Sequence, residues 1–421
     1  MNANPYPFEL SDRSTWLCVG KLLDGSLSAP LHSAHVVFDR DTIQYVGENP
    51  PPAQLVSGQS EPHATLPDHT LLPGLIEGHS HLFLEGAELD FETRKAYQNQ
   101  SPDALREHAR NRLPRILQTG VIAMRDGGDK DGVGLGLKTH RNGQVPSITS
   151  PGAAIYHQGR YGSFIGSPLE AHASPEACVA SRIAEGADHI KVVPTGIINF
   201  QNGQVTKAPQ MEADEIRAFV TAARTHHAHV MAHASGSEGV ENAIQGGVDT
   251  IEHGFFVTAD QLSRMRDQNI AWVPTFIPVQ IQVDEAAKMG WTPKIVVNLQ
   301  KILDAHAQRL QDAARLGVTI IAGSDAGSCG VAHGLGLLIE LDLMVRAGLS
   351  TAHALHAATG ASASHFTFSE KIGCVQAGYK PRMILTAYDP IQSVAHLQKE
   401  KWLILDGHWH HCPAPLDSAG L

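Results

Sequence analysis

The chain has 421 residues, 42% hydrophobic and 18% charged, which is typical of a globular enzyme and excludes disordered and fibrous classes. Its formal net charge of −11 comes without a clustered Lys/Arg stripe, so a small-molecule partner is favoured over nucleic acid or an anionic membrane. The length exceeds the ~250 residues of an eightfold barrel, and no low-complexity linker divides it, so we expect one large domain with a smaller one appended.

The first residues of the chain do not resemble a signal peptide. Residues 1–16 carry Glu9, Asp12 and Arg13 and lack a basic segment followed by an apolar one. No apolar run approaches the ~18 residues of a transmembrane helix, so a cytoplasmic location is expected. The five cysteines are scattered singly, which argues against a disulfide framework or a zinc ribbon. They are Cys18, Cys178, Cys329, Cys374 and Cys412.

Residues 16–47 contain short alternating segments with turn signals, typical of β-strands. Between 70 and 360 amphipathic stretches of helical period alternate with short apolar runs, which predicts βα units around a parallel sheet. Helices are expected at 104–117, 175–185, 215–226, 238–245, 259–268, 297–316, 334–346 and 351–358. Strands are expected at 121–124, 189–193, 229–233, 249–253, 270–275 and 318–322.

The segment 372–411 again favours strands, with one at 383–387 and a hairpin at Asp406-Gly407. Two β-rich ends therefore predict one small domain built from both.

The pattern His79-Ser80-His81 lies near the start of the βα region. In an extended chain residues two apart point the same way, so both imidazoles can face one metal ion. With 25 histidines the pattern is expected by chance about once or twice. Two more pairs occur, at His227/His229 and His408/His410. We interpret the former as a helix end that enters a strand and the latter as part of a surface hairpin, and neither as a ligand pair.

Further polar residues stand where later apolar strands end. They are Lys191, His233, His253 and Asp325. Each has a structural alternative: a strand-end histidine can be a satisfied core residue, Asp325 a helix N-cap, and Lys191 a lysine that only reaches the surface. Because barrel enzymes keep their active sites at the C-terminal ends of strands, the ordered set together with the first histidine pair favours a metal site.

Several motifs along nearly the whole chain carry a resemblance to a known family. They are Pro73-Gly74-Leu75-Ile76-x-x-His79-x-His81, Gly120-Val121 with Arg125-Asp126, Gly186-Ala187-Asp188-x-Ile190-Lys191, His233-Ala234, Ile251-Glu252-His253-Gly254, Gly323-Ser324-Asp325-Ala326-Gly327, His333-Gly334, Glu340-Leu341 and Ala357-Ala358-Thr359. The chain resembles the metal-dependent amidohydrolases, in the imidazolonepropionase-like and Xaa-Pro-dipeptidase-like branch with carboxypeptidase- and ochratoxinase-like hydrolases. The resemblance implies a (β/α)8 TIM barrel of residues 71–365 and a small β-sandwich domain assembled from 1–70 and 366–421.

In the branch with a lysine at the end of strand four, that lysine is usually carboxylated by CO2 and bridges two metal ions. The resemblance implies that one ion is held by His79, His81 and Asp325. The other is held by His233 and His253, and the carbamate of Lys191 bridges both ions together with a hydroxide. A carbamate supplies two carboxylate-type oxygens, whereas an ammonium would repel both ions. These ligands suit Zn²⁺ best, with manganese, cobalt and iron as alternatives.

Two metal ions ~3.5 to 4 Å apart lower the pKa of a shared water and polarise a carbonyl. Asp325 would then take the proton of the nucleophile and pass it to the leaving nitrogen. The implied reaction is hydrolysis of a C–N bond at a carbonyl.

The loop at 155–162 departs most from the resembled family. Many relatives carry a Thr-Gly-Gly-His-Gly run there whose histidine polarises the scissile carbonyl, and an ungapped match puts Tyr161 at that place. A phenol can donate to a developing oxyanion, and His157 is a competing candidate. Arg160 could pair with a substrate carboxylate or serve as a surface ion-pair partner.

The leading substrate class is an N-acyl amino acid or dipeptide with a free carboxylate, or a related amide such as ochratoxin A, by analogy with the family. One alternative is a mononuclear cyclic-amide hydrolase or deaminase of the imidazolonepropionase type, which Lys191 disfavours. Another is a non-enzymatic metal-binding scaffold, which would leave the ordered ligands without purpose. The metal content distinguishes the three functions: two ions per chain favour the binuclear amide hydrolase, one ion the mononuclear enzyme, and none the scaffold. A homo-oligomer is left open.

Overall fold

The computed structural model describes residues 14–138 and 145–414. Its parallel strands form two sheets, ordered β5-β6-β7 and β13-β12-β11-β10-β8-β9. These strands are β5 (Leu75–Ser80), β6 (Val121–Asp126), β7 (Ser147–Thr149), β8 (Ala154–Tyr156), β9 (Gly166–Pro168), β10 (His189–Val192), β11 (His229–Ala234), β12 (Thr250–His253) and β13 (Ala271–Val273). Every pairing within both sheets is parallel. The prediction of an α/β architecture is confirmed.

Helices alternate with these strands, and those predicted from periodicity are confirmed to within a few residues. The helices are α1 (Phe91–Gln98), α2 (Pro102–Gln118), α3 (Val133–Leu137), α4 (Pro175–Ala184), α5 (Ala213–Thr225), α6 (Ser237–Gly246), α7 (Ala259–Asp267), α8 (Ile277–Asp284), α9 (Pro293–Leu316), α10 (Leu335–Arg346), α11 (Thr351–Ala357) and α12 (Gly360–His365). Local sequence sets their ends: α9, for example, starts at Pro293 behind the capping hydroxyl of Thr292 and stops at Gly317, whose φ is 79°. The described helices include none that is both long enough and apolar enough to cross a membrane.

The segment 318–322 was predicted as a strand but forms only isolated backbone bonds, and through these it connects the two parallel sheets. It pairs with β13 through a single bridge between Ile320 and Trp272. On its other side the carbonyl of Ala322 accepts the backbone N–H of Gly78, within β5, at 2.9 Å. The backbone N–H of Asp325 then donates to the carbonyl of His79 at 2.7 Å. These bonds place residue 325 beside the end of β5.

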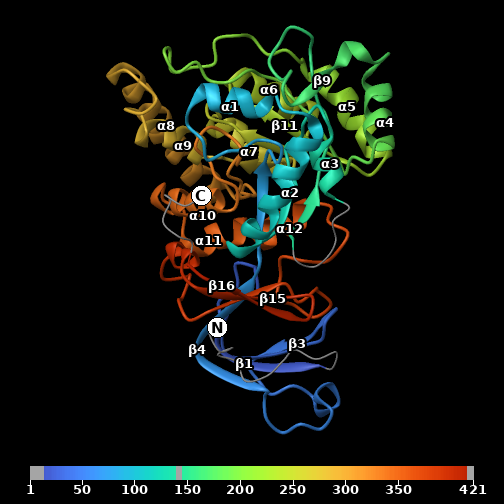
Figure 1. The fold of residues 1–421 in the computed structure, drawn as a ribbon, viewed down its shortest axis with the longest axis vertical. Coiled ribbons are helices and arrows are strands. Elements are labelled where there is room, and N and C mark those ends of the chain that lie inside the picture. Colours follow the sequence, from blue (N-terminus) through green and yellow to red (C-terminus); the bar gives the residue numbers. More distant parts are fainter. Residues whose placement is uncertain (1–13, 139–144, 415–421) are drawn as a thin grey trace.

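Strands from both chain ends form a third sheet, ordered β16-β15-β14-β4-β1-β2-β3. They are β1 (Thr15–Leu22), β2 (Leu31–Phe38), β3 (Ile43–Gly47), β4 (Ala64–Pro73), β14 (Met383–Thr386), β15 (Lys401–Leu405) and β16 (His408–Cys412). Figure 1 shows this composite sheet, blue and red, at one end of an elongated molecule and the helix-covered parallel strands at the other. The predicted hairpin is confirmed: Asp406 and Gly407 join β15 to β16 with φ of 48° and 78°.

Strand β4 links the composite sheet directly to the parallel strands. It continues to Pro73, so the predicted domain boundary at residue 70 falls inside it, and only Gly74 separates it from β5. Successive side chains of a strand point to opposite faces. Accordingly Leu71 is buried in the core of the composite sheet, whereas Leu72 is buried in the larger core of the parallel strands. One extended segment therefore belongs to both cores.

Candidate metal centre

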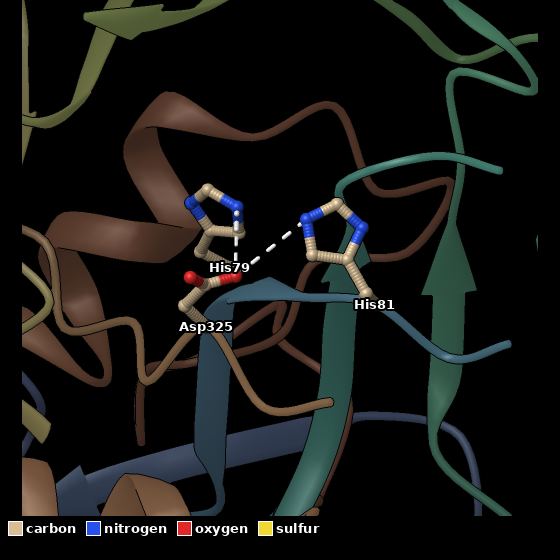
Figure 2. Close-up of side chains that lie close together, drawn as sticks. All are labelled: His79, His81 and Asp325. Atoms are coloured by element: carbon tan, nitrogen blue, oxygen red, sulfur yellow. Dashed lines mark ion pairs between the residues drawn. The ribbon is translucent and has the colours of Figure 1, made fainter. Parts of the chain in front are cut away.

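Three predicted ligands meet beyond the end of β5. The Nε2 atoms of His79 and His81 each lie 3.5 Å from Oδ1 of Asp325, and ligand atoms from all three residues lie within 4.8 Å of one another. Figure 2 shows both imidazoles turning a nitrogen toward one carboxylate oxygen. In a strand, residues two apart share a face, which brings the histidines to the same carboxylate. This donor set is one that metal ions of the zinc type prefer.

The other predicted ligands adjoin this group. The rings of His79 and His253 lie 5.1 Å apart between centroids, and those of His253 and His233 lie 4.5 Å apart. Lys191, on β10, is 1% exposed, and its charge acts on all four imidazoles. Five of the six residues singled out from the sequence therefore meet at the ends of β5, β10, β11 and β12. The sixth, Asp325, joins them from the end of the segment 318–322.

Several buried nitrogens in this cluster have no hydrogen-bond partner in the described residues. They include Nε2 of His79, Nε2 of His233 and Nζ of Lys191. Buried polar atoms are almost always hydrogen-bonded, so three unpartnered ones in a single cluster require an explanation. A metal centre supplies one, because the two imidazole nitrogens would bind the ions directly and Lys191 would do so through the oxygens of its carbamate. The residues present therefore fit the metal ions that the sequence predicts.

Hydrogen bonds from outside the cluster orient the histidine rings. Nδ1 of His79 donates to Glu252 at 2.8 Å, and Nδ1 of His81 donates to the carbonyl of Gly128 at 3.1 Å. Nδ1 of His253 is hydrogen-bonded with the hydroxyl of Thr275 at 2.8 Å. All three bonds occupy Nδ1 and direct Nε2 toward the cluster, and the acceptors at His79 and His81 also fix the tautomer of these two rings.

The surroundings keep the histidines uncharged at neutral pH. Burial and, next, the charge of Lys191 lower the pKa of His81 to about 4 and that of His233 to about 3. Burial also lowers the pKa of Lys191 to about 8, although the charge of Glu252 opposes the shift. Burial raises the pKa of Asp325 to about 7. Neutral imidazoles are the form that binds metal ions.

A buried ion pair beneath the cluster was not predicted from the sequence. Arg125 donates to Glu252 at 2.8 Å and, through Nε, to the carbonyl of Gly78 at 2.8 Å, and both charged side chains are at most 3% exposed. Its guanidinium also lies 4.2 Å from the centre of the Phe366 ring. The signal in the sequence was an arginine near the end of one strand and a glutamate within another, since such charges have to be paired when the strands are buried.

The backbone is strained where the ligands emerge. His253, Asp325 and Thr275 have φ of 67°, 52° and 53°, in the left-handed region that side chains disfavour. Such conformations cost about 1 to 3 kcal/mol each and persist where a site requires them. Gly127 is needed for a different reason: a Cβ there would lie 2.6 Å from Cε1 of His81.

A cavity of about 250 Å³ opens onto the cluster. Its lining includes Lys191, His233 and Asp325 on one side and mostly aromatic and aliphatic side chains elsewhere. Tyr161 lines it as well, with its ring 5.4 Å from that of His233. Burial and, next, the charge of Asp325 raise the pKa of the tyrosine, so the phenol keeps its proton.

The structure does not bring His157 or Arg160 to this cavity. Nδ1 of His157 pairs with Glu170 at 2.8 Å and Nε2 pairs with Glu215 at 2.9 Å, which occupies both ring nitrogens. The guanidinium of Arg160 donates to the carbonyl of Ala208 at 2.6 Å. Neither residue lines the cavity.

The two other His-x-His pairs lie where the sequence suggested. His227 and His229 span the junction between α5 and β11, and His408 and His410 lie on strand β16 of the hairpin. None of the four belongs to the metal-ligand group found among residues 14–138 and 145–414.

Comparisons with known proteins agree with this architecture. Residues 70–408 match the model of the amidohydrolase family. Ochratoxinase of Aspergillus niger is 26% identical over 424 residues, covering 92% of this chain and 84% of that protein. An uncharacterised protein of Mycobacterium tuberculosis is 28% identical over 291 residues, 68% of this chain and 72% of its own. The crystal structure of a Xaa-Pro dipeptidase with methionine bound in its active site gives a TM-score of 0.77 at 26% identity, covering 94% of this chain and all (100%) of that chain.

Proposed function

Because the chain belongs to the amidohydrolase family and is a hydrolase, we propose that it is a binuclear metal-dependent enzyme that cleaves carbon–nitrogen amide bonds. The observation that carries this proposal is the meeting of two buried imidazole nitrogens at one carboxylate oxygen, in a cluster where buried nitrogens of Lys191 and His233 have no hydrogen-bond partner among the described residues. Relatives named ochratoxinase and Xaa-Pro dipeptidase support a small amide as substrate. The class we propose comprises N-acyl amino acids, dipeptides and related amides such as ochratoxin A.

The proposed ligands fall into two sets and a bridge. His79, His81 and Asp325 would hold one ion, His233 and His253 the other, and carboxylated Lys191 would bind both. Zn²⁺ is the ion that suits this donor set best. When bound, such ions acidify a water molecule and polarise the scissile carbonyl.

The surroundings of Lys191 support its carboxylation. With a pKa of about 8, a substantial fraction of its amine is uncharged at neutral pH. The nitrogen lone pair attacks CO2, a C–N bond forms, and the nitrogen loses one proton, which yields a carbamate anion. Because Nζ has no hydrogen-bond acceptor among the described residues, no existing bond opposes this reaction.

Asp325 is the proposed proton carrier. Its Oδ2 accepts the hydroxyl of Ser328 at 2.9 Å, whereas Oδ1 faces the histidines. A carboxyl group with a pKa near 7 can take a proton from the attacking water and return it to the leaving nitrogen at neutral pH. Tyr161 would donate its hydroxyl proton in a hydrogen bond to the oxyanion that develops on the substrate.

We also propose that the two parallel sheets close into one (β/α)8 barrel, with 318–322 as the eighth strand position. The bridge at Ile320 and the bond from Gly78 to Ala322 support closure on one side. On the other side the N–H of Asp188, just before β10, donates to the carbonyl of Ser150, just after β7, at 2.9 Å. The composite sheet would form the separate domain, with its boundary near Pro73 instead of residue 70.

Metal analysis combined with turnover tests the proposal. The purified chain, loaded with Zn²⁺ in bicarbonate buffer, should retain two ions after gel filtration and hydrolyse members of a panel of acyl amino acids, dipeptides and their amides. One ion with ring opening of a cyclic amide would instead favour the imidazolonepropionase-type alternative. A chain that retains no metal would contradict both.

A further inference from the structure

The described residues that line the cavity beside the candidate metal centre offer no separate cation for a substrate carboxylate. Among the described residues that line it, every lysine, histidine and carboxylate belongs to the proposed metal centre, and there is no arginine. The remaining polar lining side chains are uncharged at neutral pH, namely those of Tyr161, Ser235, Gln282, Ser328 and Cys329. A free carboxylate enclosed here would therefore lose its hydration without gaining a cationic partner outside the metal centre, which is costly.

Three arginines outside the cavity lining are hydrogen-bonded to other acceptors. Arg94, whose charge acts on Asp325, donates to the carbonyl of Gly327 at 2.9 Å and to that of Glu88 at 3.2 Å. Arg160 donates to a backbone carbonyl, as described above. Arg125 is buried in its ion pair with Glu252. None of these three side chains lines the cavity.

The outer wall of the cavity is instead apolar and held in place. The segment after β10 contributes Ile197, Ile198 and Phe200 to the lining. The side-chain amide of Asn298, on α9, donates to the carbonyls of Phe200 and Gln201 at 3.1 and 3.0 Å. The ring of Phe200 meets that of Trp291 edge-on, at 5.9 Å between centroids. This wall is therefore anchored to a long helix.

The wall also presents apolar surface to solvent at the cavity. Ile197 lines the cavity and yet is 56% exposed. An exposed apolar side chain beside a binding cavity is a common feature of sites that take apolar ligands. Phe164 and Phe255 add further apolar surface to the lining of the cavity.

We infer that the enzyme prefers amides whose leaving amine carries an apolar group and no free carboxylate, such as acyl amino acid amides and anilides. This inference rests on the proposed amide hydrolysis and shifts its preferred substrates from N-acyl amino acids and dipeptides to the related amides without a free carboxylate. It also reverses the expectation of a carboxylate-ended substrate, which the sequence supported only through Arg160.

A matched substrate pair tests the inference. N-benzoyl-phenylalanine and N-benzoyl-phenylalaninamide have the same scissile bond and differ only in the charge of the leaving amine. With the metal-loaded full-length enzyme, kcat/KM for benzoate release should be about tenfold or more higher for the amide. Binding of both compounds to the Asp325→Asn variant, measured by calorimetry, should show the same preference without turnover.

Adding a cation to the wall should reduce this preference. Ile197→Arg places a guanidinium at a position that already tolerates exposure, and it should lower the amide-to-acid ratio of kcat/KM by about fivefold. Leu27→Arg is the matched control: Leu27 is 49% exposed, lies between β1 and β2, and does not line the cavity. The ratio should be unchanged in that variant.

Each result decides the inference. If the amide binds more tightly but neither compound is hydrolysed, the inference stands and the proposed hydrolysis fails. Equal or better binding of the free acid overturns the inference even if both compounds are hydrolysed. If neither compound binds, the cavity does not recognise this class and the inference fails as well.

Discussion

Two lysines are equally buried in different regions of the molecule, and only one belongs to the candidate site. Lys191 on β10 and Lys401 on β15 are each 1% exposed, and burial lowers the pKa of both to about 8. Nζ of Lys401 donates to the carbonyl of Leu397 at 2.7 Å, whereas Nζ of Lys191 has no partner among the described residues. Depth and pKa alone therefore do not identify a reactive lysine. What distinguishes Lys191 is its unoccupied nitrogen beside four imidazoles.

The largest expected effect comes from removing Lys191. Lys191→Ala should lose most bound metal and lower kcat by about 10³ or more, since both proposed ions share this residue. Lys401→Ala is the control and should lower stability while the metal content stays at the wild-type value. ¹³C NMR with labelled bicarbonate should show a carbamate signal that disappears only in the first variant. Full activity of Lys191→Ala would exclude the bridge.

Asp325→Asn should give the next largest effect. The amide keeps the size of the side chain but cannot take a proton, so kcat should fall by about 10² or more with little change in thermal stability. Steady-state kinetics and melting curves measure the two quantities. A kcat within a few-fold of wild type would mean that another residue carries the proton.

A pair of buried glutamates tests whether hydrogen bonding to the ligands matters. Glu252→Gln removes the charge that holds Nδ1 of His79, so metal affinity should fall about 10- to 100-fold. Glu340→Gln is the control, because Glu340 accepts the N–H groups of Phe276 and Ile277 and contacts no ligand. Competition with a chelator measures both affinities. Equal losses in the two variants would indicate a general structural effect.

Tyr161→Phe should lower kcat by about tenfold and leave KM almost unchanged, because a bond to the oxyanion forms mainly in the transition state. Kinetics on one substrate of the panel suffice to measure this. A rise in KM with an unchanged kcat would assign Tyr161 to ground-state binding.

The smallest effect concerns Lys401 and pH. Its folded-state pKa of about 8 lies below the ordinary 10.5, so between these values the unfolded chain binds more protons and stability rises with pH. From pH 8 to 9 the free energy of unfolding of the wild type should therefore rise by about 1 kcal/mol relative to Lys401→Met. Chemical denaturation at both values measures the difference. A difference that does not change with pH would mean that Lys401 keeps its ordinary pKa.

Much of the fold was predictable because local sequence and tertiary structure agree. The amphipathic period and the capping residues predicted α4 and α9, and the Asp406-Gly407 pair predicted the hairpin of β15 and β16. Helix α8 was not predicted: residues 277–284 alternate apolar and polar residues as a strand does. Glu340, distant in sequence, accepts the N–H groups at its start and so stabilises a helix there.

The sequence singled out residues that meet in the candidate site, but it did not indicate what surrounds them. His79, His81 and Asp325 lie at strand ends, which sequence periodicity locates. The partners of His157 lie 13 and 58 residues away along the chain, and its position between two carboxylates depends on the tertiary fold alone. For the same reason, only the structure shows that Arg160 is bound to a backbone carbonyl.

Strand β4, which belongs to both cores, also determines when the composite sheet can be completed during synthesis. Strand β4, which leads directly into the strand of the first two histidines, is hydrogen-bonded by β1 on one side and by β14 on the other. The β14 partner of Pro73 is Met383, more than three hundred residues later. A ribosome adding about 5 to 20 residues per second needs at least ~15 seconds to make that stretch. Throughout that time one edge of β4 is unpaired, so this edge is where we expect a nascent chain to need protection from aggregation.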